Sequence, residues 1–249
     1  MVESQTRDQF SQPDFQECQL ILPLYIVCDT SGAMTGALPA LRQNLASLVE
    51  DLASDPVIAD TTMLSIITFD NVARTLVPLS DPDSVKVPEM NASGGASYSQ
   101  AFEEYNRGFT RDYRCLQQAN CRVFRPHVFF LTSGQANDIW EDTFQRLIAW
   151  DPVTKTGNKM YPYIMAFGFG GASEGELKKT VYPNFGEKLG RWVLYQTNEV
   201  DEILSSVFDT IRKVGLAPAH GMPSGQYQFL LTPPELTVNA ITGEAEVLL

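Results

Sequence analysis

Residues 22–34, LPLYIVCDTSGAM, decide the fold of this chain. A short apolar run with β-branched and aromatic members stops abruptly at Asp29, Thr30, Ser31 and Gly32. A run of this kind is typical of a buried strand. Asp29 and Ser31 are therefore expected at the carboxyl end of a strand, which is where open α/β sheets bind their ligands.

Strand-like and helix-like segments alternate along the rest of the chain. Further apolar runs predict strands at residues 63–69, 72–79, 128–131, 163–169 and 191–195. Apolar residues spaced three and four apart predict amphipathic helices at residues 38–52, 138–150 and 199–214. A glycine-rich turn at 93–97 opens another helix, expected to run to about Arg114.

This alternation predicts the α/β class, as a doubly wound, Rossmann-like domain. The central sheet is expected to be mainly parallel, with helices on both faces. Asp70 and Asn71 separate two apolar runs and look like the turn of a hairpin, which would add one antiparallel edge strand.

Three regions are expected along the chain: a polar N-terminal segment (1–19), the α/β domain (20–214) and a C-terminal extension (215–249) rich in proline and glycine. The extension contains short strand-like runs at 227–231, 236–238 and 246–249. Two interpretations remain open for it: a tail docked on the domain, or a segment that binds a partner. The N-terminal segment has no apolar stretch of the kind a secretory signal needs.

The composition argues against several classes of function. Eighteen Lys and Arg against thirty Asp and Glu give a formal charge of −12, which would repel nucleic acid and an anionic membrane. No stretch approaches the length of a transmembrane helix, so a cytoplasmic protein is expected. Four cysteines do not suggest a disulfide scaffold, and Cys115 and Cys121 are expected to be thiols.

No catalytic pattern is recognisable, so the chain is not expected to be an enzyme. Its two histidines, His127 and His220, lie far from any recognisable nucleophile, and Ser31 is not in a G-x-S-x-G turn. The glycines at 94 and 95 lack the lysine of a phosphate-binding loop.

Four motifs occur in an order that resembles von Willebrand factor A (VWA) domains: VCDTSGAM (27–34), ITFDN (67–71), ASGGAS (92–97) and FFLTSGQANDIW (129–140). The resemblance covers residues 20–214 and is strongest to the bacterial TerY-like branch, which is associated with tellurite resistance and stress response. It implies the VWA fold. It also implies a metal-ion-dependent adhesion site (MIDAS), built on a D-x-S-x-S motif, a threonine and a distal aspartate.

Mapping that site onto this sequence leaves it degenerate. Asp29 and Ser31 match the motif, but Ala33 replaces the second serine, Ala96 replaces the threonine and Ser133 replaces the distal aspartate. Magnesium needs near-octahedral oxygen coordination, and methyl groups supply none. No metal cofactor is therefore expected, and Asp29 and Ser31 are interpreted first as turn and capping residues. The alternative is weak Mg²⁺ or Mn²⁺ binding by Asp29, Ser31 and Ser133.

The expected function is a non-enzymatic protein–protein interaction module. Contacts with the partner are expected from the loops around the degenerate site, at Thr30, Met34, Ser97 and Asn137, or from the C-terminal extension. The TerY-like resemblance implies a bacterial stress or conflict system with a PP2C-like phosphatase and a protein kinase as partners. Two alternatives are a VWA domain that binds its ligand through a weakly held metal and, more remotely, a phosphoester hydrolase that uses Asp29.

Overall fold

The computed structural model describes residues 19–186, 189–221 and 238–245, and a mixed sheet forms its centre. The strands follow the spatial order β10-β9-β8-β5-β1-β2-β3, with the short β4 beside β1. Their bounds are Leu20–Asp29 (β1), Thr62–Phe69 (β2), Ala73–Ser80 (β3), Arg122–Val123 (β4), His127–Thr132 (β5), Tyr163–Gly168 (β8), Arg191–Tyr195 (β9) and Ala240–Glu244 (β10).

The central strands are parallel, as the alternation of strands and helices predicts. β1 pairs in parallel with β2 and β5, and β8 pairs in parallel with β5 and β9. β3 is the predicted hairpin strand and runs antiparallel to β2. The α/β class with an antiparallel edge strand is thus confirmed. At the opposite edge β10, which belongs to the C-terminal extension, runs antiparallel to β9. This part of the extension is therefore docked on the domain, which is one of its two interpretations, although the sequence predicted no strand at these residues.

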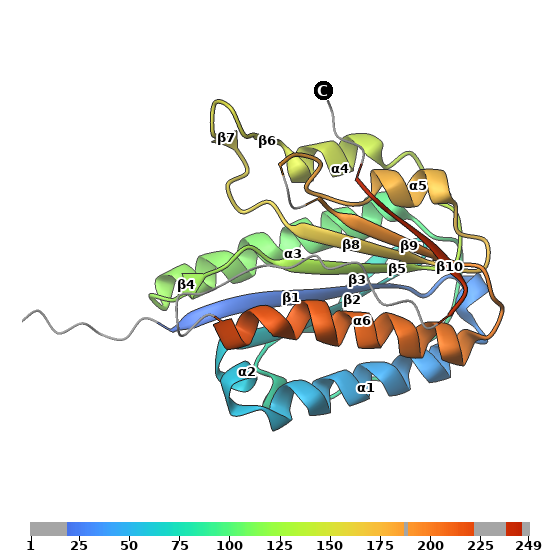
Figure 1. The fold of residues 1–249 in the computed structure, drawn as a ribbon, viewed down its shortest axis with the longest axis horizontal. Coiled ribbons are helices and arrows are strands. Elements are labelled where there is room, and N and C mark those ends of the chain that lie inside the picture. Colours follow the sequence, from blue (N-terminus) through green and yellow to red (C-terminus); the bar gives the residue numbers. More distant parts are fainter. Residues whose placement is uncertain (1–18, 187–188, 222–237, 246–249) are drawn as a thin grey trace, which may run out of the picture.

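Helices cover both faces of this sheet (Figure 1). One face carries α1 (Leu38–Ser54), α2 (Pro56–Thr61) and α6 (Val200–Gly221), and the other carries α3 (Tyr98–Gln118), α4 (Glu141–Ile148) and α5 (Glu174–Lys179). Shorter elements lie in the connections: the 3-10 turns η1 (Gly32–Met34) and η2 (Pro82–Ser84), and a small hairpin of β6 (Trp150–Asp151) and β7 (Thr156–Gly157).

β1 is buried on both faces, which explains its uninterrupted apolar sequence. Leu22, Leu24 and Ile26 point to the core beneath α1 and α6, whereas Tyr25 and Val27 point to the core beneath α3 and α4. A strand with alternate side chains in two cores has no polar face. This central position also holds the end of β1, at Asp29, in the middle of the sheet.

The C-terminal part departs from the sequence prediction in two ways. α6 continues to Gly221, so residue 214 does not end the last helix, and Pro218 lies within it. The strand at Ala240–Glu244 falls between the predicted strand-like runs; it pairs with β9, where Gly243 lies close against the indole of Trp192. The runs at 227–231 and 246–249, and most of 236–238, lie outside the described residues.

Two expectations from composition concern cysteines and membranes. Cys28, Cys115 and Cys121 form no disulfide with one another. Among the residues that the structure describes, no helix combines the length and apolarity that a membrane crossing requires.

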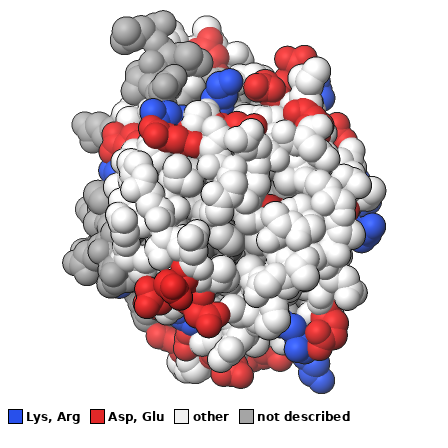
Figure 2. All heavy atoms as spheres, turned by 90° about the vertical axis from the view of Figure 1, so that its right-hand side faces the viewer, with Lys and Arg blue, Asp and Glu red and all other residues white. Residues whose placement is uncertain are grey.

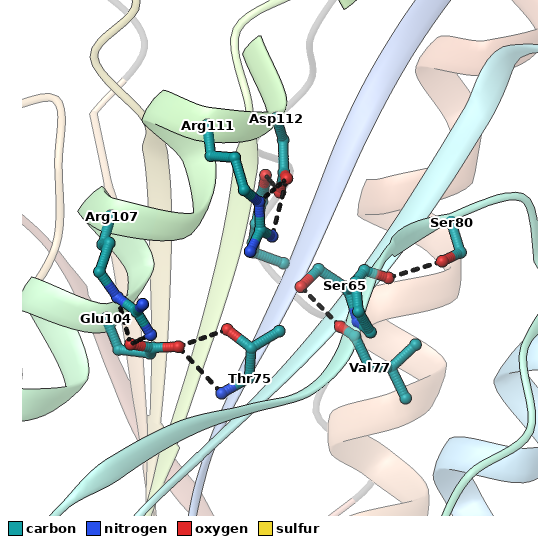
Figure 3. A network of polar contacts seen from close by, with 10 residues as sticks. Ser65, Thr75, Val77, Ser80, Glu104, Arg107, Arg111 and Asp112 are labelled. Atoms are coloured by element: carbon teal, nitrogen blue, oxygen red, sulfur yellow. Dashed lines mark hydrogen bonds and ion pairs between the residues drawn. The ribbon is translucent and has the colours of Figure 1, made fainter. Parts of the chain in front are cut away.

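A polar cluster joins α3 to the hairpin edge of the sheet (Figure 3). Glu104, on α3, is only 7% exposed. Its carboxylate accepts the backbone N–H of Thr75 on β3 at 3.0 Å, the hydroxyl of the same threonine, and the guanidinium of Arg107. Burial favours the neutral form of Glu104, but the bonds from Thr75 and the charge of Arg107 outweigh it and hold the pKa of this carboxyl below its ordinary value.

This cluster predicts a pH-dependent contribution to stability. We expect Glu104→Gln to lower the free energy of unfolding by about 1–3 kcal/mol at neutral pH. Because the folded pKa is depressed, the contribution is complete above the unfolded pKa of about 4.3 and is lost as the pH falls through the folded value. Urea denaturation of both proteins should therefore show the difference shrinking in acid. Glu103→Gln, at the exposed neighbouring position, should show neither effect; a difference that stays constant with pH would contradict the prediction.

Candidate functional site

The site lies where the order of the strands reverses. From β1 the chain crosses to β2 on one side, and later strands extend from β5 to β8 and β9 on the other. The carboxyl ends of β1 and β5 therefore diverge at a topological switch point, which is the usual ligand position in open α/β sheets. Asp29 ends β1 and Ser133 follows β5, so the structure brings these two predicted site residues together.

The carboxylate of Asp29 is fully buried and is held by donors from two loops. One oxygen accepts the backbone N–H of Ser31 at 2.7 Å. The other accepts the backbone N–H of Ser133 at 2.9 Å, its hydroxyl at 3.3 Å and the hydroxyl of Thr132 at 3.2 Å. The turn role predicted for Asp29 is thus confirmed. Ser31 is buried too, but its side chain does not cap the η1 turn that follows, so its predicted capping role is wrong.

These donors and acceptors do not fit a divalent metal. At the positions mapped from the adhesion-site motif, Asp29 is the sole carboxylate, and both its oxygens accept protein hydrogen bonds. Ala33 and Ala96 offer no side-chain oxygen, and the backbone of Ala96 pairs with Ala136 instead. Within the described ranges no cluster of three or more His, Cys, Asp or Glu could hold a metal ion. Neutral hydroxyls cannot supply the charge that Mg²⁺ requires of its protein ligands.

A second buried carboxylate, Asp70, lies at the end of β2. It accepts the hydroxyl of Ser93 at 2.6 Å and the backbone N–H of Val72 at 2.8 Å, and Arg74 lies 3.6 Å away. Burial would raise its pKa, but these bonds and the charge of Arg74 outweigh the burial and lower the pKa below the ordinary value. Asp70 therefore stays ionised and fixes both the hairpin turn and the 91–97 loop.

A third carboxylate, Asp138, holds the beginning of α3. It accepts the backbone N–H groups of Tyr98 and Ser99, both at 3.1 Å, and the hydroxyls of Ser97 and Ser99. Orphan N–H groups at a helix start usually find a partner in the adjacent cap residue. Here a residue 41 positions away supplements Ser97, so no local sequence signal pointed to Asp138.

Of the four residues predicted to contact a partner, three are buried and one is exposed. Thr30 is buried and its hydroxyl donates to the carbonyl of Phe69 at 3.1 Å, Met34 lies entirely in the core, and Ser97 is the buried N-cap of α3. Asn137 alone of these four is exposed, and its amide donates to Asn71 at 3.2 Å. The expectation that Thr30, Met34 and Ser97 present their side chains to a partner needs correction, because the loops turn them inward.

What these loops do present to solvent is an uncharged surface. They comprise residues 30–37, 70–72, 91–97, 133–139, 169–173 and 196–198. The two charged residues in these ranges are Asp70, which is buried, and Asp138, which is half-buried and bound to the start of α3, so none of the exposed residues is charged. Figure 2 looks onto this edge of the sheet and shows an uncharged area across its middle, with charged side chains gathered along the margins. We call this surface the neutral face. In a chain with a net charge of −12, such an area is distinctive.

A small pocket opens on the neutral face beside Ser133. It has a volume of about 290 Å³ and lies between the loops that follow β1, β5, β8 and β9. Its floor is apolar, with Phe169 and Ile203 both buried, and Ala33, Gly36 and Asn198 lie at its exposed rim. Of these residues, only Ala33 and Ser133 belong to a motif that the sequence predicts to be part of a site; Gly36, Phe169, Asn198 and Ile203 lie outside the recognised motifs.

This chain was compared with protein families, curated proteins and solved structures, and only the solved structures are similar to it. No protein-family model matches the sequence, and no curated protein matches it. Among solved structures, the chain is similar to a von Willebrand factor type A protein from Catenulispora acidiphila (15% identity, TM-score 0.54, 81% of this chain and 43% of that one). It is also similar to the ArnB paralog VWA2 from Sulfolobus acidocaldarius (13% identity, TM-score 0.52, 77% and 45%).

A third similar structure is proximal thread matrix protein 1 of the mussel byssus, solved with zinc in its MIDAS motif (19% identity, TM-score 0.50, 77% of this chain and 46% of that one). This chain spans less than half the length of each of these three solved chains. At such identities the likeness concerns the fold, and the parallel sheet, the antiparallel edge and the helices on both faces agree with it. This chain therefore has the von Willebrand factor A fold.

Proposed function

We propose that this chain is a non-enzymatic protein-interaction module that binds its partner through the neutral face without a bridging metal. The observation that carries the proposal is the absence of exposed charge from all six loops at the carboxyl edge of the sheet. Charged residues are depleted from the centres of protein interfaces, because they are costly to desolvate. The carboxylates of Asp29, Asp70 and Asp138 support the proposal further, because each accepts hydrogen bonds that hold these loops together.

Two apolar side chains give the neutral face contact points. Ile139, in the loop after β5, is 88% exposed, and Val72, in the hairpin turn, is 47% exposed. Large apolar side chains at such exposure gain burial when a partner covers them. Asn71 and Asn137 lie between the loops and offer amide groups for hydrogen bonds. A rigid surface that combines apolar and amide groups suits a protein partner.

The sequence motifs support a more specific setting as part of this proposal. The resemblance to TerY-like domains supports the proposal that the chain acts in a bacterial stress or conflict system in the cytoplasm, with a PP2C-like phosphatase and a protein kinase as candidate partners. The acidic composition supports a protein partner over nucleic acid or an anionic membrane. Catalysis is not part of the proposal. His127 begins β5 at the opposite edge of the sheet, and burial lowers its pKa to about 3. The other histidine, His220, lies near the end of α6.

The proposal predicts that a charge on the neutral face weakens binding. Ile139→Glu places an unpaired carboxylate at the interface, so we expect partner affinity to fall at least tenfold, roughly 1.4 kcal/mol. Val153→Glu is the matched control, since Val153 is also 88% exposed but lies in the turn between β6 and β7, away from the neutral face.

The measurement is affinity capture from the native host, read by mass spectrometry and run in parallel with Mg²⁺ and with EDTA. Proteins captured in both conditions by the unmodified chain and by Val153→Glu, but lost with Ile139→Glu, would support the proposal. Capture only with Mg²⁺, or equal capture by both variants, would refute it.

A further inference from the structure

The pocket beside Ser133 has a composition that favours one kind of occupant. All eleven of its lining residues are uncharged. Phe169, Ile203 and Val200 provide apolar walls, and Thr197 and Asn198 add polar groups toward the opening. Its volume of about 290 Å³ is at or below the lower end of small-molecule sites, about 300–1,000 Å³. This space is large enough to admit one side chain of a partner.

Glycines shape one wall of the pocket. Gly170 has a φ of +60°, and a Cβ there would lie 3.2 Å from the carbonyl oxygen of Ser133. The N–H of Gly171 donates to that same oxygen at 2.9 Å. The loop after β8 is thereby held against the loop after β5, so the pocket is preformed and its occupant need not open it.

The electrostatics of the pocket select against an acidic occupant. Ser133 lines the pocket, and its buried hydroxyl donates to the carboxylate of Asp29 at 3.3 Å. No charged residue lines the pocket to compensate that carboxylate, and the donors that hold it are neutral. A carboxylate entering the pocket would find no cation among the lining residues, would lie near the residue that binds the Asp29 carboxylate, and would lose its own water. An apolar side chain carries no charge, so it is neither repelled nor stripped of water that hydrates a charge.

We infer that this pocket receives one uncharged apolar side chain, such as leucine, that anchors the protein partner to the neutral face. The inference rests on the proposed function and adds the chemistry of recognition to it. Buried anchors in preformed pockets contribute most of the binding energy in many interfaces. The partner therefore needs an apolar residue at the anchor position, and an aspartate or glutamate there would not bind. Residues of the partner that flank the anchor are free to carry positive charge, which the acidic chain attracts.

The test uses two small probes, N-acetyl-leucine methylamide and N-acetyl-aspartate methylamide, titrated into the isotope-labelled protein and followed by amide NMR shifts. We expect saturable shifts at Gly170 and Gly171 with the leucine probe, and at least tenfold weaker binding of the aspartate probe. No saturable shift at these glycines with the leucine probe, or equal binding of both probes, would overturn the inference.

Gly36→Leu provides the blocked pocket. A Cβ at Gly36 meets nothing within 4 Å, so the substitution is compatible with the fold, and it adds a large side chain at the rim of the pocket. Gly175→Leu, on the exposed side of α5, is the matched control. The leucine probe should bind at least tenfold more weakly to Gly36→Leu and unchanged to Gly175→Leu, with both variants melting cooperatively.

Partner capture separates this inference from the proposed function. If Ile139→Glu abolishes capture and Gly36→Leu does not, the neutral face binds the partner but the pocket holds no anchor, and the inference falls alone. If Ile139→Glu leaves capture unchanged, the proposed function falls. Loss of capture with both variants, together with the probe selectivity above, supports both.

Discussion

Asp29→Ala is expected to lower the free energy of unfolding by about 2–6 kcal/mol, because two buried backbone N–H groups lose their acceptor at about 1–3 kcal/mol each. These are the N–H groups of Ser31 and Ser133, which follow two neighbouring strands. Removing the carboxylate leaves both donors in a site from which water is excluded. The loops after β1 and β5 should then separate, and the neutral face should lose its shape.

The measurement is urea denaturation at neutral pH, with Asp55→Ala as the control. Asp55 also accepts two backbone N–H groups, those of Val57 and Ile58, but at a half-exposed helix start where water can replace it. We expect that variant to lose only about 1 kcal/mol. Equal losses in the two variants would contradict the role assigned to Asp29 as a buried link between the loops.

The other large effect is expected from Leu45→Ala in the middle of α1, at about 2–5 kcal/mol of unfolding free energy. Leu45 has no exposed surface and belongs to the core between α1, α6 and the sheet. Removing its branched end forfeits apolar burial and leaves a cavity that the surrounding strands cannot fill.

Urea denaturation also measures this variant, through a shift of the midpoint at unchanged slope. Gln43→Ala is the control on the exposed side of the same helix and should change stability by less than about 0.5 kcal/mol. If the midpoint of Leu45→Ala lay as close to wild type as that of Gln43→Ala, this face of α1 would not be packed as in the structure.

Local sequence patterns predicted the elements that form the centre of this fold. The apolar run before Asp29 became β1, and the spacing of leucines from Leu38 to Leu52 became the buried face of α1. Both patterns arise because burial imposes a period on the residues of one element, and that period can be recognised without its neighbours. For the same reason the sequence predicted that Asp29 lies at the carboxyl end of a strand, as the structure has it.

Elements that depend on partners far along the chain could not be predicted in this way. β10 has a weak apolar pattern, and its place in the sheet depends on its pairing with β9. Thr30 and Met34 looked like surface loop residues, but neighbouring strands and helices enclose them. Asp138 stabilises a helix that begins about forty residues earlier, a relation that no local motif encodes.

The sequence by itself determined the α/β class, the position of Asp29 at the end of β1, and the lack of a side-chain oxygen at Ala33 and Ala96. Each of these depends only on residue types and their order along the chain, so it can be recognised from hydrophobic periodicity or from the atoms that a side chain offers. Only the tertiary structure decided that Asp29 links two loops, that six loops join into the neutral face, and that a preformed pocket opens beside Ser133. These features arise where strands distant in sequence end side by side, so their physical cause is the packing of the sheet.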